Sequence, residues 1–400
     1  MKTDSTNSKL MKPQTLRSLR SARRAALGVV VVSALGLAGA LRAQNFDTGS
    51  DGRLGDVVIT TNTTLDLPDD GKLHFSSLTV DTGATLRFNR NPRNTPVFIL
   101  SQSEVVINGT INLDGAAQIA NAGGRGGPGG FDGGKPGFGP EVPPGHGYGP
   151  GGGHGGPDNC TDSATTAVGA GHGTRRSGFS GSLYGNSLLI PLVGGSGGGG
   201  VASNPNGGGG GGGGAVMIAA NNRVAVNGSI LARGGNGGGC INGGSGGAIR
   251  LVSFKVEGGG SLNANGGGNA GNGRVRIDTV IRTALNFSIT GVSSIGGNLL
   301  VFPPEVPTLT VTEAAGNTVT NGSGPVVFTL PFGSTTNRTI RIQAQNFARN
   351  VPIRVTLTPD SGDKLVFDAE VDNSAVNPAS VDVPVTVPVN TLVTVHCWTR

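Results

Sequence analysis

The stretch from Arg223 to Gly268 alternates apolar and polar residues like a β-strand, turns into glycine, and then repeats both patterns. The unit AVMIAANNRVAVNGSILARGG, which begins at Ala215, aligns with AIRLVSFKVEGGGSLNANGG, which begins at Ala248, a spacing of 33 residues. One supersecondary unit repeated at a fixed spacing is typical of a solenoid, in which each unit packs against its neighbours.

Two further units extend the alignment. VFILSQSEVVINGTINLDGAA from Val97 matches both copies, and a degraded copy, RVRIDTVIRTALNFSITG, begins at Arg274. Because no window after residue 43 has the 3.6-residue period of a helix, we predict an all-β chain containing a parallel β-helix with right-handed crossovers. A two-sheet sandwich decorated by glycine loops is the alternative. Asn108 and Asn227 are expected to stack at one corner. The residues expected to point inward are Val105, Ile107, Ile111, Val224, Val226 and Ile230.

Residues 121–214 interrupt this pattern with a glycine- and proline-rich insertion that ends in eight consecutive glycines, Gly207–Gly214. Ordering a glycine costs more backbone entropy than ordering any other residue, and the insertion has few apolar side chains to offset that cost. We therefore expect a flexible insertion. The alternative is packed, polyproline-like backbone whose strands touch where side chains are missing.

Three domains follow from the composition. Residues 1–43 have the basic start, the apolar run AALGVVVVSALGLAGAL and the small residues of a signal peptide. Residues 44–302 are assigned to the β-helix with its insertion. Residues 303–400 contain runs such as TLTVTEA, RTIRIQAQNF and VPIRVTLTPD, and their spacing predicts an immunoglobulin-like β-sandwich.

The charge distribution excludes nucleic acid as a partner. The formal net charge is +6, but residues 1–43 hold eight basic side chains against Asp4, which leaves the rest of the chain near −1. The basic character therefore belongs to the signal peptide and not to a nucleic-acid surface. No later segment is long and apolar enough to span a bilayer, so we expect a protein that is secreted or displayed on the cell surface, with no transmembrane segment after signal removal.

The signal peptide, the segments FDTGSDGRLGD, LTVDTGATLRF and VVINGTINLDG, and the spacer GGPGGFDGG together resemble Gly-rich, secreted or surface parallel β-helix proteins of bacteria, such as autotransporter and haemagglutinin passengers. The resemblance covers residues 44–300. It implies an adhesin-like protein of the cell surface. The chain departs from the autotransporter pattern after Pro303, where nothing is typical of an outer-membrane barrel.

The repeat region contains a group of basic residues that indicates a binding face. Four arginines outnumber Glu257 and Asp278, the acidic residues of 215–300. Such an excess predicts attraction to an acidic polysaccharide that weakens with salt. The predicted binding residues are Arg223, Arg250, Arg274 and Arg276.

Other side chains suggest metal binding or a covalent bridge. His146, His154 and His172 lie in the insertion, where histidine-rich tracts can bind zinc or copper, although their spacing fits no preformed site. Cys160 and Cys240 flank the repeat and are the predicted disulfide of an exported chain. No cofactor is expected apart from a structural calcium ion. Its candidate ligands are Asp47, Asp51 and Asp56 of DTGSDGRLGD.

These observations predict an exported, non-enzymatic structural or adhesin-like protein that binds an extended polymer, either a polysaccharide or a component of the extracellular matrix. The first alternative is a polysaccharide lyase or hydrolase on a β-helix scaffold, for which clustered carboxylates would be required. The second alternative is a metal- or ice-binding surface protein. Outward Thr-x-Thr ladders over several coils would favour ice binding.

Overall fold

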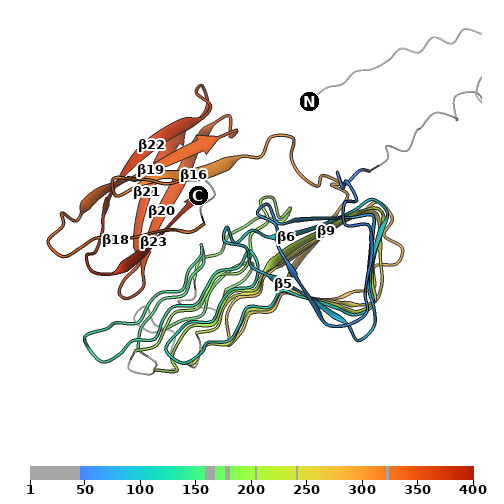
Figure 1. The fold of residues 1–400 in the computed structure, drawn as a ribbon, viewed down its shortest axis with the longest axis horizontal. Coiled ribbons are helices and arrows are strands. Elements are labelled where there is room, and N and C mark those ends of the chain that lie inside the picture. The colour runs from blue at the N-terminus through green and yellow to red at the C-terminus, as the bar shows by residue number, and fades with distance from the viewer. Residues whose placement is uncertain (1–45, 158–166, 176–180, 203–204, 240–241, 321–323) are drawn as a thin grey trace, which may run out of the picture. The chain divides into compact units, whose positions relative to one another are not determined.

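The computed structural model describes residues 46–400 apart from five short gaps, and these residues cluster as one compact unit. The expected signal peptide, Cys160 and Cys240 lie outside the described residues. The described residues form an all-β structure without a helix (Figure 1). The gaps are 158–166, 176–180, 203–204, 240–241 and 321–323. The strands are β1 (Asp56–Ile59), β2 (Thr63–Asp66), β3 (Lys72–Phe75), β4 (Ser77–Val80), β5 (Thr85–Asn89), β6 (Val97–Ser101), β7 (Glu104–Ile107), β8 (Thr110–Asn112), β9 (Ala215–Val226), β10 (Ser229–Leu231), β11 (Ala248–Glu257), β12 (Ser261–Asn263), β13 (Arg274–Asp278), β14 (Ser288–Thr290), β15 (Val292–Gly296), β16 (Thr308–Ala314), β17 (Asn317–Thr318), β18 (Val326–Thr329), β19 (Asn337–Gln345), β20 (Asn350–Pro359), β21 (Leu365–Asp372), β22 (Ala379–Thr386) and β23 (Leu392–Thr399).

The strands up to β15 form two parallel sheets. The first sheet follows the order β1-β4-β7-β9-β11-β13-β15, with β3 and β6 joined to it through β9. The second sheet follows the order β14-β12-β10-β8-β5-β2. The strands that align in the sequence are neighbours here: Ala248 pairs with Ala215, and Arg274 pairs with Ala248. Val97 lies opposite Val216 in the same sheet.

The two parallel sheets enclose one apolar core. Alternation along each strand sends every second side chain inward, so Leu78 of the first sheet and Leu86 of the second belong to the same buried cluster. This alternation follows the sequence closely. All six residues expected to point inward have 0% exposure: Val105, Ile107, Ile111, Val224, Val226 and Ile230.

The glycine-rich insertion is not flexible where the structure describes it, which corrects the expectation from composition. Extended segments leave the second sheet after β8, β10 and β12 and return to begin β9, β11 and β13. They lie side by side as the undulating green and yellow segments of Figure 1. We call the described residues of 113–214, 232–247 and 264–273 the glycine bundle.

Hydrogen bonding in the glycine bundle has a period of three residues, the period of a polyproline II helix. Within Gly207–Gly214, the N–H groups of Gly209 and Gly212 donate to one neighbouring segment, at Gly134 and Phe131 (2.9 and 2.8 Å). The N–H groups of Gly210 and Gly213 donate to a second neighbouring segment, at Asn242 and Ser245. Those of Gly211 and Gly214 donate to a third segment, at Ala116 and Leu113. Three more segments donate to the carbonyl oxygens. The residues that donate from these three segments are Gly124 and Gly127, Gly195 and Gly198, and Gly235 and Gly238.

Part of the outer face of the first sheet is also covered. Leu100, Met217 and Val252 project away from the inner core but are buried in a second apolar cluster. The segment after β15 supplies the cover through Val301 and Phe302. This cover is a contact between residues distant in sequence, and it changes the environment of neighbouring arginines described below.

The strands from β16 to β23 form two antiparallel sheets of four strands each. Their orders are β17-β16-β19-β22 and β18-β23-β20-β21. Residues of both sheets, such as Ile340 of β19 and Val355 of β20, belong to one buried cluster. The runs TLTVTEA, RTIRIQAQNF and VPIRVTLTPD form β16, β19 and β20, as predicted.

Candidate functional site

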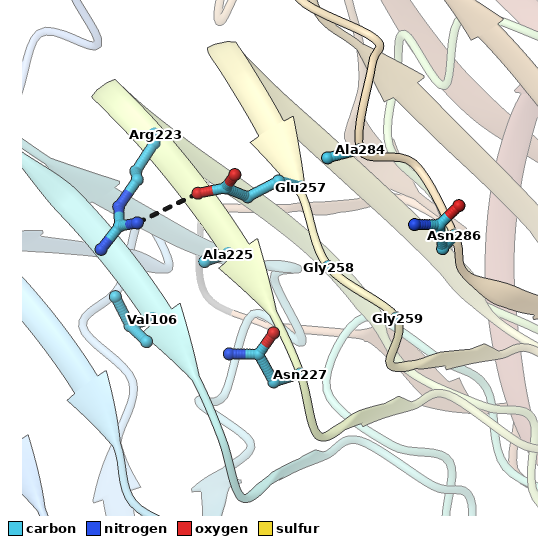
Figure 2. Close-up of a pocket in the computed structure, with 9 residues that line it drawn as sticks. All are labelled: Val106, Arg223, Ala225, Asn227, Glu257, Gly258, Gly259, Ala284 and Asn286. Carbon is cyan, nitrogen blue, oxygen red and sulfur yellow. Dashed lines mark hydrogen bonds and ion pairs between the residues drawn. The ribbon is translucent and has the colours of Figure 1, made fainter.

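A hollow of about 340 Å³ lies on the uncovered part of the first sheet's outer face, over β7, β9 and β11. Figure 2 shows Arg223 of β9 reaching toward Glu257 of β11, with Asn227 and Asn286 on the side where the strands end. We call it the Arg223 hollow. It is lined by Val106, Arg223, Ala225, Asn227, Glu257, Gly258, Gly259, Ala284 and Asn286.

The charges of the Arg223 hollow compensate one another. Arg223 Nε donates to Glu104 Oε2 (2.7 Å) and its Nη1 donates to Glu257 Oε1 (3.0 Å). Lys255 Nζ lies 2.6 Å from Glu257 Oε2. The hydrogen bond that Arg223 donates to Glu104 is the main reason that the pKa of Arg223 is raised, and the bond that Lys255 donates to Glu257 is the main reason that the pKa of Glu257 is lowered. Two basic and two acidic side chains therefore offset one another in this row, and Arg223 shares its charge between two carboxylates.

Amide side chains mark the corner between the first and second sheets. Asn227 Nδ2 donates to Asn108 Oδ1 (2.9 Å), which confirms the prediction that these two asparagines stack at one corner. The backbone pair Ile107–Val226 precedes the two asparagines and the pair Thr110–Ser229 follows them. Both pairs keep Asn108 and Asn227 in the same register. The amides therefore connect the hollow to the outer face of the second sheet.

The structure separates the four arginines predicted to share one binding face. Arg250 and Arg276 are 1% and 8% exposed, so the expectation of an exposed positive wall is wrong for them. Both bind Asp278, with Arg250 Nη2 at 3.1 Å and Arg276 Nη2 at 2.6 Å from its carboxylate. Arg274 donates through Nε to the carbonyl oxygen of Tyr184 (3.0 Å). Arg223 alone of the four lines the hollow.

The three histidines are also divided. The rings of His146 and His154 contact each other at a centroid distance of 4.9 Å, whereas the His172 ring stacks on Tyr184 at 4.3 Å. Nδ1 of His146 is buried without a hydrogen-bond partner. Among the residues described, no group of three or more His, Cys, Asp or Glu side chains is arranged to hold a metal ion. Metal binding by His146, His154 and His172 stays a prediction.

The aspartates of DTGSDGRLGD each bind a separate group. Asp47 accepts from the N–H of Gly49, and Asp51 accepts from the N–H of Arg53. Asp56 accepts from the hydroxyl of Ser77 at 2.6 Å. These bonds account for a turn tied to its neighbouring strand, and a structural calcium ion here stays a prediction. Cys397 carries a free thiol, and the predicted bridge between Cys160 and Cys240 falls outside the described residues.

The carboxylates of Glu104 and Glu257 are the candidates near the hollow for the acid–base pair that the lyase or hydrolase alternative requires. Glu104 and Glu257 both bind Arg223, which places two carboxylates in one neighbourhood. A glycoside hydrolase needs one of its pair to be a proton donor with a raised pKa. The pKa of Glu257 is shifted in the opposite direction. Glu257 therefore suits charge compensation better than proton donation.

No family model, curated protein or solved structure matches this chain. Across the described ranges, no helix combines the length and apolar character that crossing a membrane requires.

Lowering the pH should destabilise the glycine bundle through His172. Burial lowers the pKa of His172 to about 4, against about 6.5 for an unfolded histidine. Between these values the unfolded state binds more protons than the folded state. The free energy of unfolding should therefore be largest above pH 6.5 and should fall as the pH drops toward 4, by about 3 kcal/mol from this residue.

The measurement is calorimetric unfolding of the wild type and of His172→Phe across this pH range. Phenylalanine keeps a ring against Tyr184 but cannot be protonated, so the variant should lose stability less steeply on acidification. Because other buried histidines act in the same direction, the comparison is between the two slopes. Parallel slopes would contradict the assignment of this proton to His172.

Proposed function

We propose that this chain is an exported, non-enzymatic surface protein whose Arg223 hollow binds an extended, uncharged polysaccharide. The observation that carries the proposal is the compensated row of charges in an open hollow, where Arg223 bonds two carboxylates at once. Sugar hydroxyls both donate and accept hydrogen bonds, so a guanidinium, carboxylates and amides held side by side can bind them. This proposal replaces the acidic polymer expected from the sequence, because Arg223 is already neutralised.

The scaffold we propose is a right-handed parallel β-helix followed by an immunoglobulin-like sandwich. Parallel pairing of β9 with β11, broken by one β-bulge between Ser253 and Lys255, and of β10 with β12 supports the helical coil. Two antiparallel sheets around a common core support the sandwich. A stiff face built from such coils fits many weak contacts to an extended polymer.

The test compares Arg223→Gln with Arg233→Gln. Arg233 is a matched control, since it is also an ion-paired arginine, bound to Asp114 at 2.7 Å, and its exposure of 47% is close to the 40% of Arg223. Titration calorimetry with cellohexaose, xylohexaose and mannohexaose should show binding by the wild type and by Arg233→Gln. Arg223→Gln should bind at least about tenfold more weakly, because charge-assisted hydrogen bonds are lost.

Salt dependence and turnover separate the proposal from its rivals. Binding of a neutral polymer should change little with added salt, because screening acts on uncompensated charge. Tighter binding of polygalacturonate than of neutral sugars, with strong weakening in salt, would contradict the proposal. Accumulation of reducing ends or unsaturated products would favour the lyase or hydrolase alternative.

A further inference from the structure

A column of hydroxyl side chains crosses the outer face of the second sheet, one from each of five neighbouring strands. The register pairs β5 with β8, β8 with β10, β10 with β12, and β12 with β14 at these positions. Since neighbouring strands are about 4.8 Å apart, the column spans about 19 Å. We call it the hydroxyl ladder. It consists of Thr85, Thr110, Ser229, Ser261 and Ser288.

The hydroxyl ladder faces away from the core. The residue that follows each member, such as Ile111 or Ile230, belongs to the inner cluster, so the ladder residues point to the opposite side. Thr110, Ser229 and Ser261 are half-buried, and Ser288 is exposed. In the part of the chain that the structure describes, no hydrogen bond joins these hydroxyls to another protein group. They are therefore available to a ligand.

The ladder lies next to the Arg223 hollow. Asn227, which lines the hollow, is separated from Ser229 by one residue, and Asn286 is separated from Ser288 in the same way. Gly259 of the hollow lies two residues before Ser261. Three strands thus begin with a ladder hydroxyl just after a residue of the hollow.

We propose that the hydroxyl ladder and the Arg223 hollow form one binding surface, on which a neutral polysaccharide lies across the strands from coil to coil. This inference rests on the function proposed above and extends it to the direction and length of the ligand. The hollow contacts the ligand from one side, and the ladder beside it adds a row of donors and acceptors that continues to Thr110 and Thr85. Affinity should therefore rise with the length of the oligosaccharide.

The residues beside the ladder favour a sugar over ice. The second outward position on these strands pairs Asn112 with Leu231, Leu231 with Asn263, and Asn263 with Thr290, and Arg87 occupies it on β5. This column is not the Thr-x-Thr pattern expected of an ice-binding face. Amides and a guanidinium beside hydroxyls instead offer the mixed donors and acceptors that sugar hydroxyls require.

The test uses the full chain, cellobiose and cellohexaose, and a ladder variant with Thr110→Val, Ser229→Ala and Ser261→Ala. The wild type should bind cellohexaose at least about tenfold more tightly than cellobiose, since each added neutral hydrogen bond contributes modestly. The ladder variant should lose this gain and keep its affinity for cellobiose. A control with Thr308→Val, Thr310→Val and Ser380→Ala removes hydroxyls from one antiparallel sheet, that of β16 and β22, and should bind like the wild type.

The two proposals fail in different ways. If the ladder variant keeps the length dependence while Arg223→Gln loses affinity for both sugars, the ladder is overturned and the hollow stands. If Arg223→Gln binds cellobiose like the wild type, the proposed function fails. If the wild type binds none of cellohexaose, xylohexaose and mannohexaose, both are overturned. Thermal hysteresis of freezing that disappears in the ladder variant would assign this face to ice and would also overturn the proposal.

Discussion

Alanine at Gly212 is expected to lower the free energy of unfolding by about 3 kcal/mol, although the change adds a single methyl group. A Cβ atom at Gly212 would overlap the backbone of Gly195, which has no flexible side chain to move aside. The N–H of Gly212 donates to Phe131 (2.8 Å), and its carbonyl accepts from Gly127 (2.9 Å). Separating the segments to admit the methyl group would stretch these bonds together.

The measurement combines scanning calorimetry with hydrogen exchange of the amides of Gly207–Gly214. Exchange at these amides should accelerate, because the bundle opens more easily. Gly259→Ala is the control, since a Cβ there has open space around it and the backbone needs no left-handed conformation. Its stability should change by about 0.5 kcal/mol or less. Equal melting shifts for the two variants would contradict close packing in the glycine bundle.

The repeat was sufficient to predict that β9, β11 and β13 are neighbours and that β8, β10 and β12 are neighbours, for a physical reason. The alternation in RVAVNGSIL fixes which face of each strand is apolar, and a shift by one residue would turn Ile230 outward. Similar alternation at EVVINGTIN therefore dictates the register Ile230–Ile111. The same alignment places Ser229 beside Thr110, so the hydroxyl ladder could have been found from the repeat.

The order of the glycine bundle could not be derived in this way. Composition counts apolar side chains as the compensation for ordering entropy, and Gly207–Gly214 has none. The compensation comes from backbone groups: each N–H from Gly209 to Gly214 has a carbonyl partner on a neighbouring segment. The hydrogen bonds made in this way offset the loss of water from the buried amides. Strands at both ends of each segment also hold the termini in place, which lowers the entropy still to be lost.

The exposed arginine wall was wrong for a different reason. Alternation correctly sends Arg250 to the side of β11 opposite Ile249 and Leu251, which lie in the inner core. Exposure on that side depends on whether another segment covers it. The residues after β15 do so, and Arg250 Nη2 donates to the carbonyl oxygen of Leu300 (2.7 Å). The contact joins residues far apart in sequence, and no local pattern predicts it.

Replacing Asp278 by alanine is expected to cost about 3 to 5 kcal/mol of unfolding free energy, because it leaves buried positive charge without a partner. Asp278 is 0% exposed and accepts hydrogen bonds from Arg250 and Arg276. Its Oδ1 also accepts from the N–H of Asn298 at 3.2 Å. The carboxylate thus holds two guanidinium groups and the segment that covers them. Thermal and urea unfolding measure the loss.

A control substitution in an exposed ion pair separates the effect of burying a charge from the effect of losing its partner. Asp368 bonds Arg354 Nε at 2.8 Å but is 38% exposed, so Asp368→Ala should cost several times less than Asp278→Ala. A triple variant that also carries Arg250→Met and Arg276→Met should regain much of the loss, since apolar residues of similar volume need no counter-ion. If Asp278→Ala melts like Asp368→Ala, the two arginines are hydrated in solution, and the segment after β15 does not close over the first sheet.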